Sequence, residues 1–232
     1  MKDKEYVDKF NVTTAILVDG GFYRKRARYL YGPKTPVERA NELVDYCTKL
    51  LHDKYEHRYL YRIFYYDCPP VNKNVYHPFL KHGINLSKTD EYLWMNAFLN
   101  ELKHRRKFAL RMGKISEGTM QYVLKSDTVK RLFSGKITLD DISENDFMLD
   151  AEQKGVDMRI GVDISSLAFK KQVNQIILIS GDSDFVPAAK QARREGIDFI
   201  LDPMRSIVKE DLYEHIDGIR SISPKTPMKE ES

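Results

Sequence analysis

The chain alternates between short runs of apolar, often β-branched residues and longer stretches in which apolar positions recur three or four residues apart. The short runs predict strands over residues 14–18, 59–66, 108–112, 175–180 and 197–201. The longer stretches predict helices from about residue 22, over 37–52, 91–105 and 155–171, up to about 195, and over 209–216. Strands that alternate with helices favour βαβ units, so the pattern predicts an α/β fold with a mainly parallel sheet.

The same pattern predicts one domain with two short ends. We place the domain at residues 13–220 and expect an elaborated region at about 115–150, where the apolar pattern is weakest. Residues 1–12 are expected to form an N-terminal extension. Residues 221–232 carry two prolines, little apolar content and mixed charge, which predicts a flexible tail.

Composition narrows the class of protein. The 232 residues are 42% hydrophobic with 12 Gly and 9 Pro, which excludes a disordered or collagen-like chain. Cys47 and Cys68 show neither CxxC spacing nor a nearby His pair, which argues against a zinc site and a disulfide framework. The first residues lack the apolar core of a signal peptide, and no run reaches the ~18 apolar residues of a membrane span. We therefore expect a cytoplasmic protein with no membrane partner.

Acidic residues follow two of the predicted strands. Asp19 comes directly after the strand 14–18, and Asp182 and Asp184 come directly after the strand 175–180, with glycines beside both. Sites in open parallel sheets form beyond the carboxyl ends of the strands, so these side chains converge if the two strands are neighbours. Clustered carboxylates repel one another unless a cation compensates, and oxygen-only ligands favour Mg²⁺ or Mn²⁺.

Other roles for these acids stay open. An Asp after a strand often caps the next helix, which is the alternative for each residue taken alone. Asp157 opens the predicted helix 155–171 and is a fourth candidate at the same edge. Asp163 lies six residues further on, which turns it away from Asp157 at ~3.6 residues per turn. We therefore favour for Asp163 a structural role or a role behind the metal ligands. Lys154 is a candidate phosphate contact or a solvated lysine.

The near balance of 38 Lys+Arg and 34 Asp+Glu hides local charge. Arg24 and Lys25 begin a basic stretch beside Asp19, and a second basic block covers residues 103–114. Such stretches attract a phosphate backbone, although they also occur as solvated helix faces. Phe22 and Tyr23 are candidates for stacking on a base, whereas the aromatic residues of the strand 59–66 favour core packing.

Three segments together resemble a known family. They are Ala15-Ile-Leu-Val-Asp-Gly-Gly-Phe, Lys154-Gly-Val-Asp-Met-Arg-Ile-Gly-Val-Asp and Ile177-Leu-Ile-Ser-Gly-Asp-Ser-Asp-Phe-Val-Pro. In order and spacing they resemble the bacterial NYN-domain (LabA-like) proteins of the PIN-like nuclease superfamily. The resemblance implies a three-layer α/β/α Rossmann-like PIN-type fold and metal-dependent hydrolysis of RNA.

The resemblance also implies residue roles. Asp19, Asp157 and Asp182 match the family's acids for Mg²⁺ or Mn²⁺, and Asp184 matches an auxiliary acid that is both catalytic and metal-binding. Many relatives carry an Asn after the first Asp-Gly, whereas this chain has Gly21-Phe22-Tyr23. The helix-borne Glu of many PIN nucleases has the candidates Glu91, Glu101 and Glu117.

Two hypotheses from different classes follow. The first is a metal-dependent endoribonuclease that acts on single-stranded or structured RNA. The alternative is a non-catalytic NYN domain that binds RNA or a protein as a regulator. A phosphatase of the haloacid dehalogenase type is disfavoured, because Asp19-Gly20-Gly21 lacks the second Asp of that motif. A homodimer remains open, since an aromatic-rich surface could pair.

Overall fold

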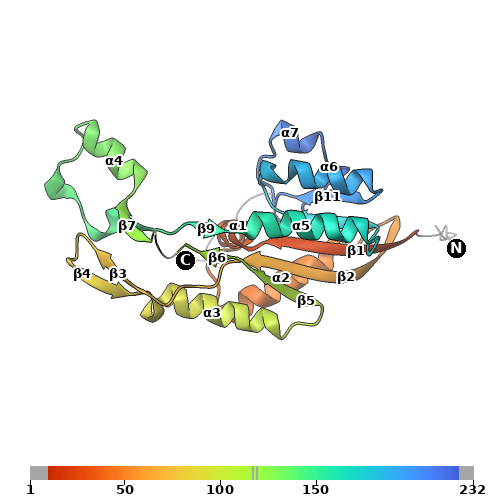
Figure 1. Ribbon diagram of the computed structural model, residues 1–232, viewed down its shortest axis with the longest axis horizontal. Coiled ribbons are helices and arrows are strands. Elements are labelled where there is room, and N and C mark those ends of the chain that lie inside the picture. The colour runs from red at the N-terminus through yellow and green to blue at the C-terminus, as the bar shows by residue number, and fades with distance from the viewer. Residues whose placement is uncertain (1–9, 117, 119, 225–232) are drawn as a thin grey trace, which may run out of the picture. The chain divides into compact units, whose positions relative to one another are not determined.

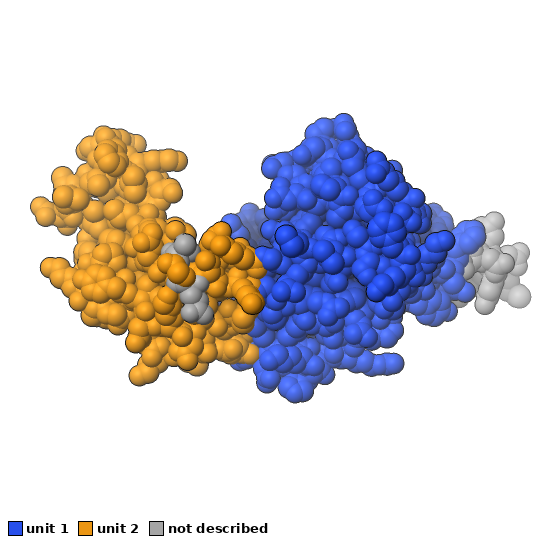
Figure 2. Space-filling model, in the orientation of Figure 1, with its two compact units in different colours: residues 1–67, 97–113, 155–232 blue, residues 68–96, 114–154 orange. Residues whose placement is uncertain are grey.

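The chain forms two compact units, coloured separately in Figure 2. A computed structural model describes residues 10–116, 118 and 120–224. The first unit comprises Met1–Asp67, Ala97–Gly113 and Gly155–Ser232, and the second comprises Cys68–Asn96 and Lys114–Lys154. The elaboration expected at about 115–150 falls in the second unit, which also includes Cys68–Asn96, a segment for which only the start of the helix 91–105 was predicted.

The first unit is built on a six-stranded parallel sheet (Figure 1). Its strand order is β12-β11-β10-β1-β2-β5. The strands are β1 (Phe10–Asp19), β2 (Glu56–Asp67), β5 (Phe108–Met112), β10 (Gln175–Ile179), β11 (Asp198–Asp202) and β12 (Gly218–Ile219). The central strand β1 is fully buried from Thr14 to Val18, which explains its continuous apolar run, because a parallel strand is covered on both faces.

Helices cover the sheet. They are α1 (Gly20–Tyr31), α2 (Pro36–Leu50), α3 (Asp90–Lys103), α5 (Val156–Phe169), α6 (Val186–Arg194) and α7 (Glu210–Tyr213). α5 packs on β1, β2, β5 and α6, and α1 packs on β1 and β2. The parallel sheet and its flanking helices confirm the predicted three-layer α/β/α fold class. No helix among the described residues is both long and apolar enough to cross a membrane.

The ends of the domain differ from the prediction. β1 begins at Phe10, so the last part of the expected N-terminal extension is strand. The start of the expected flexible tail is packed, since Ser221 Oγ donates to Asp202 at 2.8 Å and Ser223 is only 2% exposed. The remainder of the expected extension and tail, residues 1–9 and 225–232, lies outside the described residues.

The second unit has antiparallel pairs and a core of its own. β3 (Asn74–His77) pairs with β4 (His82–Asn85), β6 (Lys114–Ile115) with β9 (Gln153–Lys154), and β7 (Gln121–Leu124) with β8 (Phe147–Asp150). It also contains α4 (Ser126–Phe133) and the first part of α3, up to Asn96. Val75, Leu86 and Met120 are buried together at the centre of this unit. None of these short elements was predicted from the sequence.

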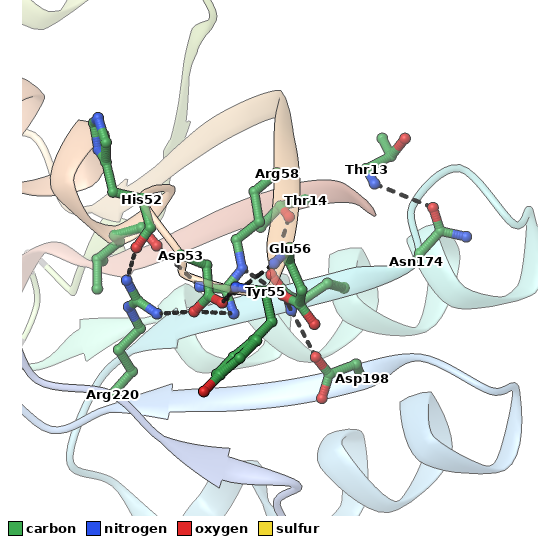
Figure 3. A network of polar contacts seen from close by, with 12 residues as sticks. Thr13, Thr14, His52, Asp53, Tyr55, Glu56, Arg58, Asn174, Asp198 and Arg220 are labelled. Carbon is green, nitrogen blue, oxygen red and sulfur yellow. Dashed lines mark hydrogen bonds and ion pairs between the residues drawn. The ribbon is translucent and has the colours of Figure 1, made fainter. Parts of the chain in front are cut away.

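Polar contacts tie together the amino ends of the sheet strands in the first unit (Figure 3). Gln175 accepts from the Thr14 hydroxyl at 3.0 Å and donates to Asp198 at 2.6 Å. Arg58 donates to Glu56 at 2.8 Å. The polar side chains at this end of the sheet hydrogen-bond mainly to one another, so these contacts stabilise the amino ends of the strands.

Candidate functional site

The opposite, carboxyl edge of the sheet carries the predicted acids. β1 and β10 are adjacent, with Val18 beside Ile179, so the residues that follow them emerge next to each other. On its other side β1 pairs with β2, and Asp19 lies beside Tyr66. We call the residues that end or follow these strands, together with the start of α5, the carboxyl edge: Asp19, Asp67, 155–157, 180–184 and Asp202.

Asp19 is held by two hydrogen bonds. Its Oδ1 accepts from the Phe22 backbone N–H at 3.0 Å, which caps α1, and its Oδ2 accepts from the Ser180 hydroxyl at 3.1 Å. Burial raises the pKa of the Asp19 carboxyl, the two hydrogen bonds lower it, and the charges of Asp157 and Asp67 raise it further. Asp19 is therefore both a helix cap and an oriented carboxylate surrounded by other acids.

Asp157, Asp182 and Asp184 form a second acidic group. Asp182 caps the short 3₁₀ turn Ser183–Phe185 by accepting from the Asp184 backbone N–H at 3.0 Å. Asp157 lies in the first turn of α5, which contacts that turn. Partial burial raises the pKa of Asp157, and the charges of Asp182 and Asp184 raise it further. The three acids are thus close enough to repel one another.

The donor chemistry of these acids fits a hard divalent cation. All are carboxylates, and their charges raise one another's pKa at one edge of the sheet, in addition to the larger effect of burial. In the described part of the chain, however, no three His, Cys, Asp or Glu side chains lie close enough to share one metal ion. The acids therefore suit a hard divalent cation by donor type, and a metal site at this edge stays a prediction.

The two aromatic candidates have different surroundings. The Phe22 ring is half-buried and lies against Gly181, where a Cβ would approach its Cε2 to 2.8 Å. Tyr23 is fully buried, and its hydroxyl donates to Glu42 at 2.9 Å. A ring in the core cannot stack on a base, so we remove Tyr23 from the candidate binding residues and keep Phe22.

The basic residues predicted to contact phosphate lie in both units and differ in their contacts. Arg24 donates through Nε and Nη2 to both oxygens of Asp67 at 3.0 Å. Lys25 is exposed on α1. Lys154 belongs to the second unit, where it pairs with Glu152 at 3.1 Å. Arg24 and Lys25 are thus the basic candidates that share a unit with the acids.

Two further acids at the carboxyl edge, Asp67 and Asp202, were not predicted from the sequence. Asp67 ends β2 and accepts from the Tyr65 hydroxyl at 2.9 Å. Asp202 ends β11 and accepts from the Tyr46 hydroxyl at 2.5 Å. Both are buried. The rule that selected Asp19, an acid directly after an apolar strand, would have found both.

Asp163 and the basic block take part in internal contacts. Asp163 accepts from the Tyr66 hydroxyl at 2.8 Å and from Arg111 at 3.0 Å. Its carboxylate therefore joins α5 to β2 and β5. Within the block, Lys107 donates to the Leu60 carbonyl.

The three candidates for a helix-borne glutamate lie in different places. Glu101 pairs with Arg105 at 3.4 Å, and Glu91 lies in the first turn of α3. Glu117 lies outside the described residues. None of the contacts described links Glu91 or Glu101 to the acids of the carboxyl edge, so a role for either stays a prediction.

Comparison with known proteins identifies the family. A crystal structure of a protein of unknown function, VPA0982 from Vibrio parahaemolyticus RIMD 2210633, is similar at 13% sequence identity, with a TM-score of 0.47, over 94% of this chain and 96% of that chain. No curated protein matches the chain. The NYN domain family matches residues 14–210, which span all the acids of the carboxyl edge. NYN domains are in general PIN-like nucleases, and this chain belongs to the NYN domain family.

Proposed function

We propose that the protein is a metal-dependent endoribonuclease that hydrolyses phosphodiester bonds in single-stranded or structured RNA. The observation that carries the proposal is the convergence of acids at one edge of the sheet, where β1 and β10 end side by side and the start of α5 contacts the turn that holds Asp182 and Asp184. The domain belongs to a family that consists in general of nucleases. Carboxylates that repel one another at a sheet edge are expected where a cation binds, because the ion offsets their charge.

The chain's own residues have distinct tasks in this proposal. Asp19, Asp157, Asp182 and Asp184 would hold Mg²⁺ or Mn²⁺. When bound, such an ion lowers the pKa of a coordinated water and polarises a phosphoryl group. Ser180 and the Phe22 backbone N–H orient the Asp19 carboxylate, and the hydrogen bond from Asp184 fixes the Asp182 side chain.

Substrate contacts would come from α1 and its start. Lys25 is exposed and attracts phosphates by charge. The exposed part of the Phe22 ring offers a surface for a base. Lys154, directly before Gly155 in the sequence, is a further candidate phosphate contact. The attacking group is water, so no nucleophilic side chain is needed.

The test is cleavage of labelled RNA by purified protein with Mn²⁺ or Mg²⁺. We expect Asp182→Asn to lower the cleavage rate by about a hundredfold or more, since removal of groups that merely orient a ligand already costs about 10–100-fold. Asp45→Asn, the same change at an exposed position on α2, is the matched control and should cleave like wild type. Cleavage that survives both Asp19→Asn and Asp182→Asn would contradict the proposal.

A second candidate function is a non-catalytic RNA- or protein-binding regulator. Two observations favour it: Gly21-Phe22 stands where relatives carry Asn, and no three acids among the described residues are within reach of one ion. It predicts RNA binding that weakens with salt, needs no metal and gives no turnover. A rise in melting temperature with Mn²⁺ in wild type, absent from Asp182→Asn, would favour the nuclease instead.

A further inference from the structure

One arginine at the carboxyl edge is held by a carboxylate that solvent does not reach. Arg24 lies in the second turn of α1 and meets Asp67 side-on, with Nε on Oδ2 and Nη2 on Oδ1, both at 3.0 Å. The Asp67 side chain is 1% exposed and the Arg24 side chain 26%. The pair therefore has a buried member, Asp67, and a member that reaches the surface, Arg24.

The buried member is fixed by its neighbours. The hydroxyl of Tyr65, itself fully buried, donates to Oδ2 of Asp67 at 2.9 Å. The backbone of Gly20 lies directly against this pair, since a Cβ there would come within 2.5 Å of the same oxygen. Asp67 is thus enclosed by the first turn of α1 and by Tyr65. If Arg24 swung away, the buried carboxylate of Asp67 would lose its ion pair with Arg24, which is unfavourable.

The exposed member retains hydrogen-bonding capacity. A guanidinium carries five N–H donors in a rigid plane, and Asp67 takes two of them along one edge. Asp67 follows Tyr66, which lies beside Asp19 in the β1–β2 pairing, so the pair lies close to the oriented carboxylate. An arginine whose plane is fixed in advance loses less freedom on binding a phosphate than a free one does.

We propose that Arg24 binds a phosphate of the RNA beside Asp19, and that Asp67 is the positioning residue that holds Arg24 for this contact. The inference rests on the proposed function only in taking RNA as the substrate. It assigns a role to Asp67, whose burial excludes direct contact with RNA. Tyr65 supports the same arrangement through its hydroxyl.

The alternative is an ion pair with no function beyond the fold, and it makes an opposite prediction. Asp67→Asn removes a negative charge from an RNA-binding edge. If Asp67 acts only through its charge, RNA binding becomes tighter in this variant. If Asp67 positions Arg24, RNA binding becomes weaker, although the protein is more positive. The sign of the change therefore separates the two explanations.

The experiment measures binding of a short fluorescein-labelled single-stranded RNA by anisotropy, over a range of salt and with EDTA to prevent cleavage. We expect Arg24→Gln to weaken RNA binding by about tenfold. We also expect it to reduce the slope of log affinity against log salt concentration by about one. Asp67→Asn should weaken it by about threefold or more, and should cause no further loss when Arg24 is already Gln, because Asp67 acts through Arg24. The control is Arg193→Gln, which breaks a more exposed pair with Asp217 at the other end of the sheet and should bind like wild type.

Each outcome bears on a defined claim. Tighter binding by Asp67→Asn, or additive losses in the double variant, would overturn the positioning role. If Asp67→Asn does not fold, Arg24→Lys replaces it in the test. Lysine keeps the positive charge at position 24 but cannot make the two parallel hydrogen bonds to Asp67. Wild-type affinity in Arg24→Lys overturns the inference. Wild-type protein that binds no RNA either in EDTA or with Mn²⁺ refutes the proposed function together with this inference. Wild-type binding that is unchanged in all Arg24 variants refutes the inference alone.

Discussion

The first turn of α1 has no room for a side chain at Gly20. A Cβ built there would lie 2.5 Å from Oδ2 of Asp67 and 2.6 Å from Cζ and the hydroxyl oxygen of Tyr65. Both neighbours are buried, and each is hydrogen-bonded to the other, so neither can move into solvent. We predict that Gly20→Ala markedly destabilises the first unit.

The magnitude follows from three contributions. Overpacking a filled site costs about 1–3 kcal/mol. Displacement of Asp67 weakens its contact with Arg24, and hydrogen bonds to charged groups contribute about 1.5–3 kcal/mol. Alanine offsets up to about 1 kcal/mol, because it forms helix more readily than glycine. The expected net loss is about 1.5–6 kcal/mol, compared with the ~5–15 kcal/mol that stabilises a typical domain.

The neighbouring glycine supplies a matched control. A Cβ at Gly21 would lie 3.7 Å from Oδ1 of Asp19, an ordinary van der Waals distance. Gly21→Ala should therefore leave stability unchanged or raise it by up to about 1 kcal/mol. Urea denaturation followed by far-UV circular dichroism measures both variants, and Trp94 fluorescence reports on the second unit, which holds the single Trp. Equal unfolding free energies for the two variants would refute the reasoning.

Two further predictions concern stability. Gly181→Ala should cost less, about 1–2 kcal/mol in the same urea assay, because the half-buried Phe22 ring at 2.8 Å can tilt; a loss as large as that of Gly20→Ala would contradict this. Burial raises the pKa of Asp202, so the folded state holds the proton more firmly and its contribution to stability falls as pH rises through the ordinary Asp range. Asp202→Asn should thus cost most near about pH 4 and less near about pH 7. The hydrogen bond from the Tyr55 backbone N–H lowers the pKa of Asp53, and Arg220 lowers it further, so Asp53→Asn should show the reverse trend, with its cost lost in acid. Unfolding free energies measured across this pH range check both signs, and a shared trend in the two variants would be inconsistent with them.

The sequence predicts the sheet of the first unit better than the second unit. β10 differs from its predicted bounds by one residue, because a fully buried parallel strand reads as an unbroken apolar run. β5 has the predicted bounds, although it is a partly buried edge strand. The β3–β4 hairpin was missed, since its strands are four residues long and its turn lacks the Asn-Gly type of signal. Lys81 instead adopts the positive φ, at 57°, that glycine usually supplies.

At the site, the acids at strand ends could be predicted and their partners could not. Asp19 and Asp182 could be predicted because each comes after an apolar strand. The paired hydrogen bonds from Arg24 to Asp67 join residues 43 apart, which no local pattern reveals. The burial of Tyr23 could have been predicted from the sequence. With Ala27 and Leu30 it lies on one helical face, and that spacing of four and three indicates a core position.

The central place of β1 in the sheet has a consequence during synthesis. β1 acquires β2 as a neighbour soon after it is made, but its other neighbour, β10, follows more than a hundred residues after β2. At the ~5–20 residues per second of translation, one backbone edge of an apolar strand stays open for on the order of ten seconds. In that interval an open edge of this kind can pair with other chains. The nascent protein is therefore most exposed to aggregation while the ribosome completes the segment between β2 and β10, well before the carboxyl edge exists.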